Sequence, residues 1–291
     1  MATPTRLAEK CSCHFRIHAI HGVRIDFLAR GRTMTKRHTR SIWVLILVVV
    51  VLGLAAVAEN LREQRTAAHP LLEFDRARVD EIAIECTGCV KRRFQRVQGH
   101  WQMVQPWQIP ADAAQVARLI DVGAAPMRRK FALAQIDATA LGFVPPFAVL
   151  TVGTQRVEFG TTDAINHARY VRVADQVALV RDRVSALLLA APERFVDPDP
   201  LAGLRHGATA VHEDGQLWTA SRLAALVALR AEAISPRAAQ TAQRVLLIRD
   251  GADRDHPFGL LVDVNGRWSL LRDDPPLAYQ LPESAAPLFV D

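Results

Sequence analysis

The chain has 291 residues, of which 50% are hydrophobic and 23% charged, a composition typical of a folded globular protein rather than of a disordered one. The net charge of +6 comes from the N-terminal flank, because residues 1–40 carry nine Lys or Arg and two acids, and the remaining residues sum to about −1. A basic flank without a basic folded surface excludes DNA and RNA as partners.

A hydrophobic segment without charges covers residues 42–58. As a helix it would be roughly 25 Å long, which is near the lower limit for crossing a bilayer. Lys36, Arg37 and Arg40 precede it, and such positive residues stay on the cytoplasmic side, so the rest of the chain is expected outside. Residues 41–58 therefore predict a single-pass transmembrane helix in the inner membrane, with the lipid bilayer as a partner and a periplasmic C-terminal part.

The N-terminal region leaves alternatives open. Ala56-Val57-Ala58 has the small-x-small pattern of a signal-peptide cleavage site, and cleavage after Ala58 would leave a soluble periplasmic protein. Residues 1–40 are interpreted as a basic cytoplasmic tail, although residues 1–33 fit an upstream start assignment with Met34 as the true start. Residues 59–70 are polar and charged, and indicate a short stalk or a continued helix.

Cys86 and Cys89 enclose a Thr-Gly turn pair, with strand-like residues on both sides. In an oxidising compartment they can form a disulfide at the tip of a hairpin. A thioredoxin-type cysteine pair instead begins a helix, whose N-terminus lowers the thiol pKa, and that context is missing here. A stapled hairpin is the favoured interpretation, and a thiol-redox role is the third functional hypothesis.

The chain after the stalk is expected to be an α+β protein of two units, residues 71–198 and a shortened residues 199–291. Antiparallel strands form meanders in both, with short helices that begin near Asp112 and near Ser221. The expected strands are residues 80–86, 89–97, 101–104, 148–152, 156–159, 169–173, 177–180, 244–248, 259–264 and 267–271.

Internal similarity predicts that the two units are a diverged tandem repeat. Residues 150–159 and 261–270 both read as strand, polar turn with glycine, strand. The strand-like residues 177–180 and 277–281 are both followed by paired large apolar residues.

Several sequence elements follow one another in a characteristic order. They are Trp101-Gln102-Met103-Val104-Gln105-Pro106, Pro110-Ala111-Asp112, Leu141-Gly142-Phe143-Val144-Pro145-Pro146, Glu158-Phe159-Gly160 and Arg169-Tyr170-Val171-Arg172. In this order they resemble DUF4340, a bacterial family of unknown function, over roughly residues 71–190. The resemblance implies an anchored envelope protein and, as in some members, association with ABC-type transport or gliding-motility components. It implies no reaction and assigns no catalytic residue.

Motifs that carry chemistry are missing from the sequence. It contains no nucleophile elbow, zinc-protease motif, phosphate-binding loop or dinucleotide-binding glycine motif. Asp250 to His256 holds four potential ligands, but their spacing meets no known pattern, so a solvated loop is favoured over a metal site. Asp163 and His167 are interpreted as members of a hairpin loop rather than as an acid–base pair. The sequence therefore predicts no enzyme, no cofactor and no metal.

Three tryptophans supply a candidate binding site: Trp101, Trp107 and Trp218 could line a cleft between the two units. The basic runs at residues 91–93 and 128–130 are interpreted as exposed edge residues, because adjacent strand residues point to opposite faces. The leading hypothesis is a membrane-anchored extracytoplasmic interaction or assembly module for an envelope partner, such as a transporter component. The alternative is a periplasmic domain that binds a small ligand or glycan.

Overall fold

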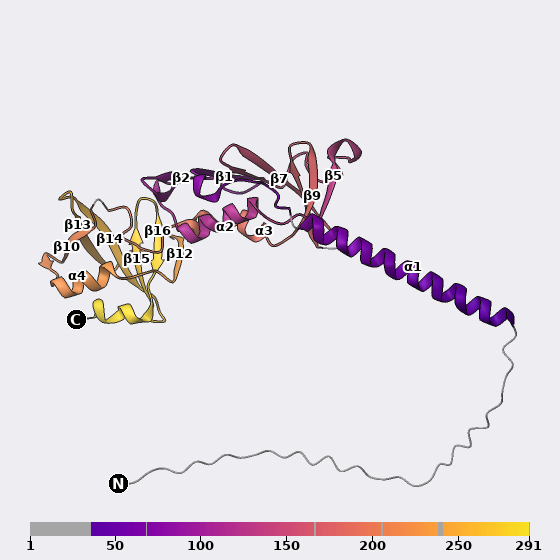
Figure 1. Ribbon diagram of the computed structural model, residues 1–291. Coiled ribbons are helices and arrows are strands. Elements are labelled where there is room, and N and C mark those ends of the chain that lie inside the picture. The colour runs from indigo at the N-terminus through magenta and orange to yellow at the C-terminus, as the bar shows by residue number, and fades with distance from the viewer. Residues whose placement is uncertain (1–35, 68, 166, 205, 238–240, 291) are drawn as a thin grey trace, which may run out of the picture. The chain divides into compact units, whose positions relative to one another are not determined.

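The structure is a computed structural model that describes residues 36–67, 69–165, 167–204, 206–237 and 241–290 (Figure 1). The expectations for residues 1–33 and for a start at Met34 lie outside the described residues. Residues 56–291 form one compact unit, which contains both β-sheets.

Helix α1 (Lys36–Ala67) contains the apolar segment. Its large apolar side chains from Trp43 to Val57 are exposed, Trp43 to 68% of its maximum. The helix continues past Ala58 into the polar residues, as one of the two interpretations of the stalk predicts. Among the residues that the structure describes, no helix is both long and apolar enough to cross a membrane.

The first sheet has nine strands, and every neighbouring pair is antiparallel. Alternation of buried and exposed residues explains why these segments form strands: on β1, Ile82 and Ile84 are buried between more exposed neighbours. The spatial order is β4-β3-β2-β1-β6-β7-β8-β9-β5. The strands are β1 (Glu81–Cys86), β2 (Arg92–Val97), β3 (His100–Gln105), β4 (Ile109–Pro110), β5 (Arg129–Ala132), β6 (Ala148–Val152), β7 (Gln155–Asp163), β8 (Ala168–Val173) and β9 (Gln176–Arg181).

Short helices cover one face of this sheet (Figure 1). Helix α2 (Ala113–Gly123) starts where predicted, because Asp112 Oδ1 accepts hydrogen bonds from the Ala114 and Gln115 amides at 2.8 and 3.3 Å. Its apolar face is buried in the core. The remaining helical segments of this region are η1 (Arg76–Arg78), η2 (Leu133–Gln135), α3 (Ser185–Leu188) and η3 (Pro192–Phe195).

The second sheet has seven antiparallel strands in the order β11-β10-β13-β14-β15-β16-β12. Helix α4 (Ala220–Val227) begins after Thr219, whose Oγ1 accepts the Arg222 amide at 3.3 Å. The cap is therefore Thr219, two positions before Ser221, near which the helix was predicted to begin. The other elements are β10 (Ala208–Glu213), β11 (Gln216–Leu217), β12 (Ala233–Pro236), β13 (Arg244–Asp250), β14 (Asp255–Val262), β15 (Trp268–Arg272), β16 (Leu277–Gln280) and η4 (Glu283–Leu288).

The two sheets share one topology. In the first sheet, β1 pairs with its hairpin partner β2 and with β6, the first strand of the meander β6–β9. In the second sheet, β10 pairs with its hairpin partner β11 and with β13, the first strand of the meander β13–β16. The strand that follows the helix, β5 or β12, pairs with the last meander strand, β9 or β16. Thus β1, β5 and β6–β9 correspond to β10, β12 and β13–β16. Residues 150–159 lie on β6–β7, and residues 261–270 lie on β14–β15. The two segments are therefore not equivalent, because β6–β7 corresponds to β13–β14, one strand earlier.

Residues on the meander fix the correspondence more finely. Phe159-Gly160 on β7 and Phe258-Gly259 on β14 are equivalent, and both phenylalanines are buried. A Cβ atom at either glycine would overlap a neighbour: the Leu141 carbonyl oxygen at Gly160 and the Ala242 side chain at Gly259. Glycine is therefore required at both places by close packing.

Candidate functional site

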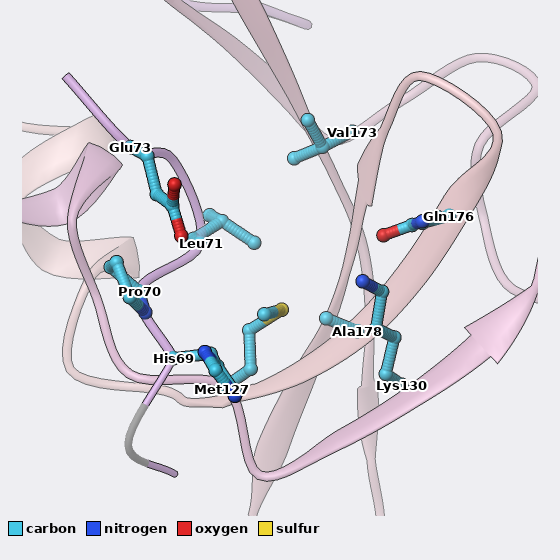
Figure 2. A pocket seen from close by; sticks show the side chains of 9 residues that line it. All are labelled: His69, Pro70, Leu71, Glu73, Met127, Lys130, Val173, Gln176 and Ala178. Atoms are coloured by element: carbon cyan, nitrogen blue, oxygen red, sulfur yellow. The ribbon is translucent and has the colours of Figure 1, made fainter. Parts of the chain in front are cut away.

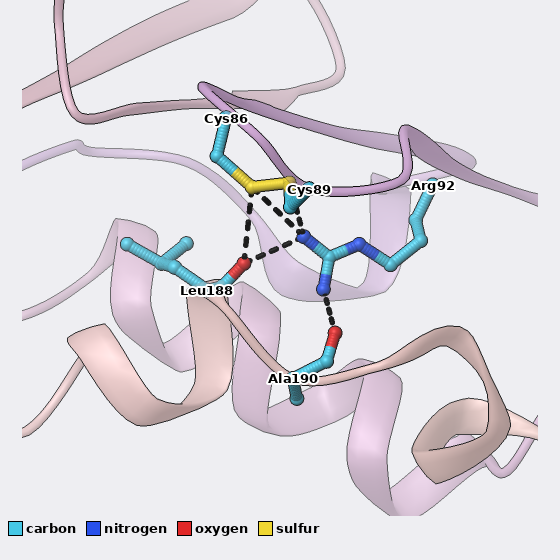
Figure 3. Close-up of a disulfide and its surroundings, with 5 residues drawn as sticks. All are labelled: Cys86, Cys89, Arg92, Leu188 and Ala190. Atoms are coloured by element: carbon cyan, nitrogen blue, oxygen red, sulfur yellow. Dashed lines mark hydrogen bonds between the residues drawn. A yellow bond between two sulfur atoms is a disulfide. The ribbon is translucent and has the colours of Figure 1, made fainter.

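Cys86 and Cys89 form a disulfide at the tip of the β1–β2 hairpin (Figure 3). Their Cα atoms are 5.4 Å apart. Cys86 ends β1, and Gly88 turns the chain with φ +78°, a conformation that glycine adopts at little cost. Both cysteines are half-buried, so one side of the pair is open to solvent.

Arg92 lies against the disulfide and is only 1% exposed. Its Nη2 is 3.3 Å from each sulfur and donates to the Leu188 carbonyl at 2.6 Å (Figure 3). Its Nη1 donates to the Ala190 carbonyl. The guanidinium therefore joins the hairpin to the segment that follows α3.

No carboxylate pairs with Arg92 among the described residues, and its Nε has no hydrogen-bond partner there. Burial lowers the pKa of Arg92 to about 10, so the group is still a cation at neutral pH. The ring of Phe195 lies 5.9 Å from the guanidinium carbon. A buried cation held only by neutral acceptors is costly, and the site is thus short of one negative charge.

The prediction that residues 91–93 are exposed is wrong for Arg92. Lys91 and Arg93 are exposed, and they pair with Glu85 and Glu81 at 3.4 and 2.5 Å. Arg92 shares its strand face with the buried Phe94, two residues on. The period of two along β2 was the signal that could have identified it.

The second sheet has an arginine cluster in the equivalent place, but with a counter-charge. Glu213 Oε2 is 3.1 Å from Arg222 Nη2 and accepts from Trp218 Nε1 at 3.0 Å, and its Oε1 is 3.1 Å from Arg244 Nη1. The two arginines donate to the carbonyls of Leu288, at 2.7 Å, and Phe289. Here too arginines join the first strand to the helical segment after the last strand.

Strand register makes Cys86 and Glu213 equivalent. Ala148 lies opposite Phe159 and Cys86, while Leu246 lies opposite Phe258 and Glu213. The turns that follow agree, since Cys86-Thr-Gly-Cys89 matches Glu213-Asp-Gly-Gln216, with both glycines at φ near +80°. The first sheet thus places sulfur where the second places a carboxylate.

The three candidate tryptophans do not gather in one site. Trp101 and Trp218 are 7% and 6% exposed and belong to the core, and Trp107 packs against it half-buried. The guanidinium carbon of Arg96 lies 4.9 Å from the centroid of the Trp101 ring, and that of Arg222 lies 3.7 Å from the Trp218 ring. Such buried indoles count against the aromatic cleft as a ligand site.

A pocket of about 480 Å³ lies between the segment at residues 69–73 and strands β5 and β9 (Figure 2). Leu71, Met127 and Ala178 give it apolar walls, and His69, Glu73 and Lys130 are its ionisable groups. None of its described lining side chains is a serine, threonine or cysteine, so they offer no hydroxyl or thiol nucleophile.

The Asp250 loop is a tight β13–β14 hairpin rather than a free loop, because β14 begins at Asp255. Burial alone would raise the pKa of Asp250, but hydrogen bonds from the Arg254 and Ala252 amides and from His256 bring it below its usual range. The carboxylate closes the turn, and no metal-binding cluster of His, Cys, Asp or Glu occurs within the described part of the chain. Similarly, Asp163 accepts the Ile165 amide at 3.1 Å within a turn.

A second pocket, of about 710 Å³, is rich in arginine. Val122, Val184 and Leu187 are among its apolar residues. Its one carboxylate, Asp121, pairs with Arg76 at 3.1 Å. Five arginines line it, and within the described residues none of them pairs with a carboxylate: Arg118, Arg128, Arg181, Arg183 and Arg194.

Comparisons with known proteins identify no relative: no family model, no curated protein and no solved structure matches the chain.

Proposed function

We propose that this protein is a membrane-anchored extracytoplasmic interaction module, not an enzyme, held in the inner membrane by residues 42–58. The observation that carries the proposal is the exposed apolar surface of α1 from Trp43 to Val57, which water solvates poorly and lipid solvates well. Although no described helix meets the length and apolarity of a membrane span, this exposed apolar surface is the feature that the proposal rests on. The basic residues that precede it favour a periplasmic location for the sheets.

Two further observations support this function. A disulfide at Cys86 and Cys89 suits an oxidising compartment. The shared topology of the sheets supports a diverged tandem repeat, a design that presents two related surfaces to a partner. The resemblance to DUF4340 makes an envelope protein, including a component of an ABC-type transporter, the partner class to test first.

The anchor is tested with the full chain in bacterial membranes. We expect it to stay in the membrane pellet after alkaline carbonate extraction, and Val48→Glu combined with Val51→Glu to release it. Arg78→Glu combined with Arg156→Glu is the control. It makes the net charge more negative than the two valine changes do, but at exposed sites outside α1, and it should not release the protein from the membrane. A mature N-terminus at Glu59 and a soluble product would instead establish cleavage after Ala58.

Orientation and partnership need separate measurements. Alkaline phosphatase fused after residue 291 should be active, because the enzyme folds only outside the cytoplasm. Crosslinking before affinity purification should enrich specific envelope proteins over a control in which the same helix carries an unrelated domain. An inactive fusion, or identical proteins in both samples, would contradict the proposal.

The second candidate function is ligand binding, and the arginine-rich pocket favours it in place of the aromatic cleft. Arginine binds phosphate and carboxylate groups in bidentate geometry, and about 710 Å³ is the size of a small-molecule site. The apolar residues beside the arginines suit an anionic amphiphile, and short-chain phosphatidylglycerol is a soluble probe. Arg128→Gln with Arg183→Gln should weaken its binding about tenfold or more, while Arg78→Gln with Arg156→Gln should not. Equal binding of the phosphatidylcholine analogue would exclude this function.

A further inference from the structure

We infer that Cys86 and Cys89 form a reducible disulfide that exchanges with a dithiol partner, and that Arg92 stabilises the thiolate formed on reduction. The redox chemistry follows from the hairpin itself and does not depend on the membrane anchor. It gives the cysteine pair a role beyond that of a staple.

The charge balance of the site is the first reason. Arg92 is buried, and among the described residues it contacts carbonyl oxygens and disulfide sulfurs but no carboxylate. The equivalent cluster of the second sheet contains the carboxylate of Glu213. Among the described contacts of Arg92, the cysteine sulfurs are the groups that can become negative, and they do so only in the reduced protein.

The neighbouring groups assign different roles to the two sulfurs. Cys86 Sγ lies 3.7 Å from the Leu188 carbonyl oxygen, so a Cys86 thiol can donate a hydrogen bond there. Arg92 Nη2 lies 3.3 Å from both sulfurs and can donate to a thiolate on either, so the Leu188 carbonyl beside Cys86 is what distinguishes the two. The reduced pair is therefore a Cys86 thiol beside a Cys89 thiolate.

Among the described residues, Arg92 is the charged group that hydrogen-bonds the sulfurs of the pair. On the hairpin, Glu85 pairs with Lys91 at 3.4 Å in the exposed layer. Residues 185–190 carry no ionisable side chain, and Glu193 and Arg194 come after the Ala190 carbonyl that Arg92 holds. The Leu188 carbonyl dipole opposes a thiolate on Cys86, which further favours Cys89.

The exchange reaction balances with a dithiol as the reductant. A thiolate of the dithiol attacks Cys86 Sγ, the Cys86–Cys89 bond breaks, and Cys89 leaves as the thiolate beside Arg92. The second thiol of the dithiol then attacks the mixed disulfide, its proton passes to Cys86, and the dithiol leaves as a disulfide. Two electrons reach the protein, and the hydrogen bond from Arg92 to Cys89 makes this thiolate the better leaving group. The half-buried cysteines leave the pair accessible to such a partner.

The test uses the full chain in a neutral detergent, equilibrated in mixtures of reduced and oxidised dithiothreitol and quenched by alkylation. Arg92→Gln should make the disulfide harder to reduce, with a shift of the equilibrium constant of about tenfold or more. Arg169→Gln is the matched control, since Arg169 is also a buried arginine of this sheet but bonds Gly160 and Asp182. A shift below about twofold for Arg92→Gln, or an equal shift for the control, would overturn the inference.

A second measurement stands even if Arg92→Gln fails to fold. In Cys86→Ser, the serine hydroxyl can replace the thiol donor, and the rate of Cys89 alkylation is followed against pH by mass spectrometry of peptides. The inference requires an apparent thiol pKa clearly below the ordinary value of about 8.5. An apparent pKa at or above that value would show that burial outweighs Arg92, and the disulfide would then be only structural.

Discussion

The seven strands that the two sheets have in common follow the same order, but the corner at the end of the first strand, at Cys86 or at Glu213, is stabilised by different chemistry in each. In the second, Glu213 is the shared counter-charge of Arg222 and Arg244, which hold the chain after β16. In the first, Arg92 holds the chain after α3 next to a disulfide and has no carboxylate among the described residues. Both corners therefore use arginine, supplied by β2 in the first sheet and by α4 and β13 in the second, and they differ in the group that lies opposite it.

The strongest way to test the correspondence is through the equivalent phenylalanines. Phe159→Ala and Phe258→Ala each remove a fully buried ring next to a required glycine, and each should lower the free energy of unfolding by about 3–5 kcal/mol. The measurement is denaturant unfolding of the full chain in detergent. If one change costs much less than the other, the two positions are not equivalent in packing.

Glu213→Gln breaks the ionic corner of the second sheet. Two partly buried arginines would lose their shared counter-charge, so we expect a loss of about 2–4 kcal/mol in the free energy of unfolding. Glu85→Gln is the control, because Glu85 pairs with Lys91 in solvent, and it should change stability by less than about 1 kcal/mol. Equal effects of the two changes would mean that the Glu213 cluster is not a structural element.

The equivalence of Cys86 and Glu213 can be tested by giving the first hairpin the side chains of the second. Cys86→Glu with Cys89→Gln would copy the second hairpin and give Arg92 a carboxylate. This variant should be about 1–3 kcal/mol more stable than Cys86→Ala with Cys89→Ala, which leaves the cation without any charged partner. Chemical unfolding of both variants under oxidising conditions measures the difference. A carboxylate variant less stable than the alanine variant would refute the equivalence of Cys86 and Glu213.

The smallest effect concerns the β13–β14 turn. Val152 ends β6 at the place where Asp250 ends β13, so this carboxylate belongs to the second sheet alone. Because the folded-state pKa of Asp250 lies below its unfolded value, its contribution is complete above about pH 4 and is lost as the pH falls below it. Asp250→Asn should lower the unfolding temperature at pH 7 and flatten its decline in acid. A variant with the wild-type acid profile would show that other carboxylates dominate.

Local signals in the sequence were enough to predict much of the fold. Asp112 starts α2 because a carboxylate before an apolar face caps a helix, and the meander strands follow their alternating residues. The short edge strands β5 and β12 and strand β10 were missed, because the first two have few apolar residues and are specified by pairing with β9 and β16. The cap at Thr219 was missed because two neighbouring hydroxyls offered the same signal, and only backbone geometry selects one.

The candidate site was predictable only in part. The cysteine pair and its turn could be read from the sequence, but the position of Arg92 between the sulfurs and the carbonyls of Leu188 and Ala190 depends on residues about a hundred positions apart. The tryptophans misled for a physical reason: an indole fills a core as well as it lines a cleft, and composition does not distinguish the two.

The edges of both sheets limit how other chains can join them. One edge of each sheet is a strand of only two residues, β4 or β11, and β4 ends in a proline that lacks an amide hydrogen. The opposite edges are four residues long; β5 begins with Arg129 and Lys130, and β12 ends in Pro236. Such edges offer little backbone for strand addition, which protects against edge-to-edge aggregation in a crowded compartment. A partner of the proposed interaction module is therefore expected to recognise side chains rather than to extend a sheet.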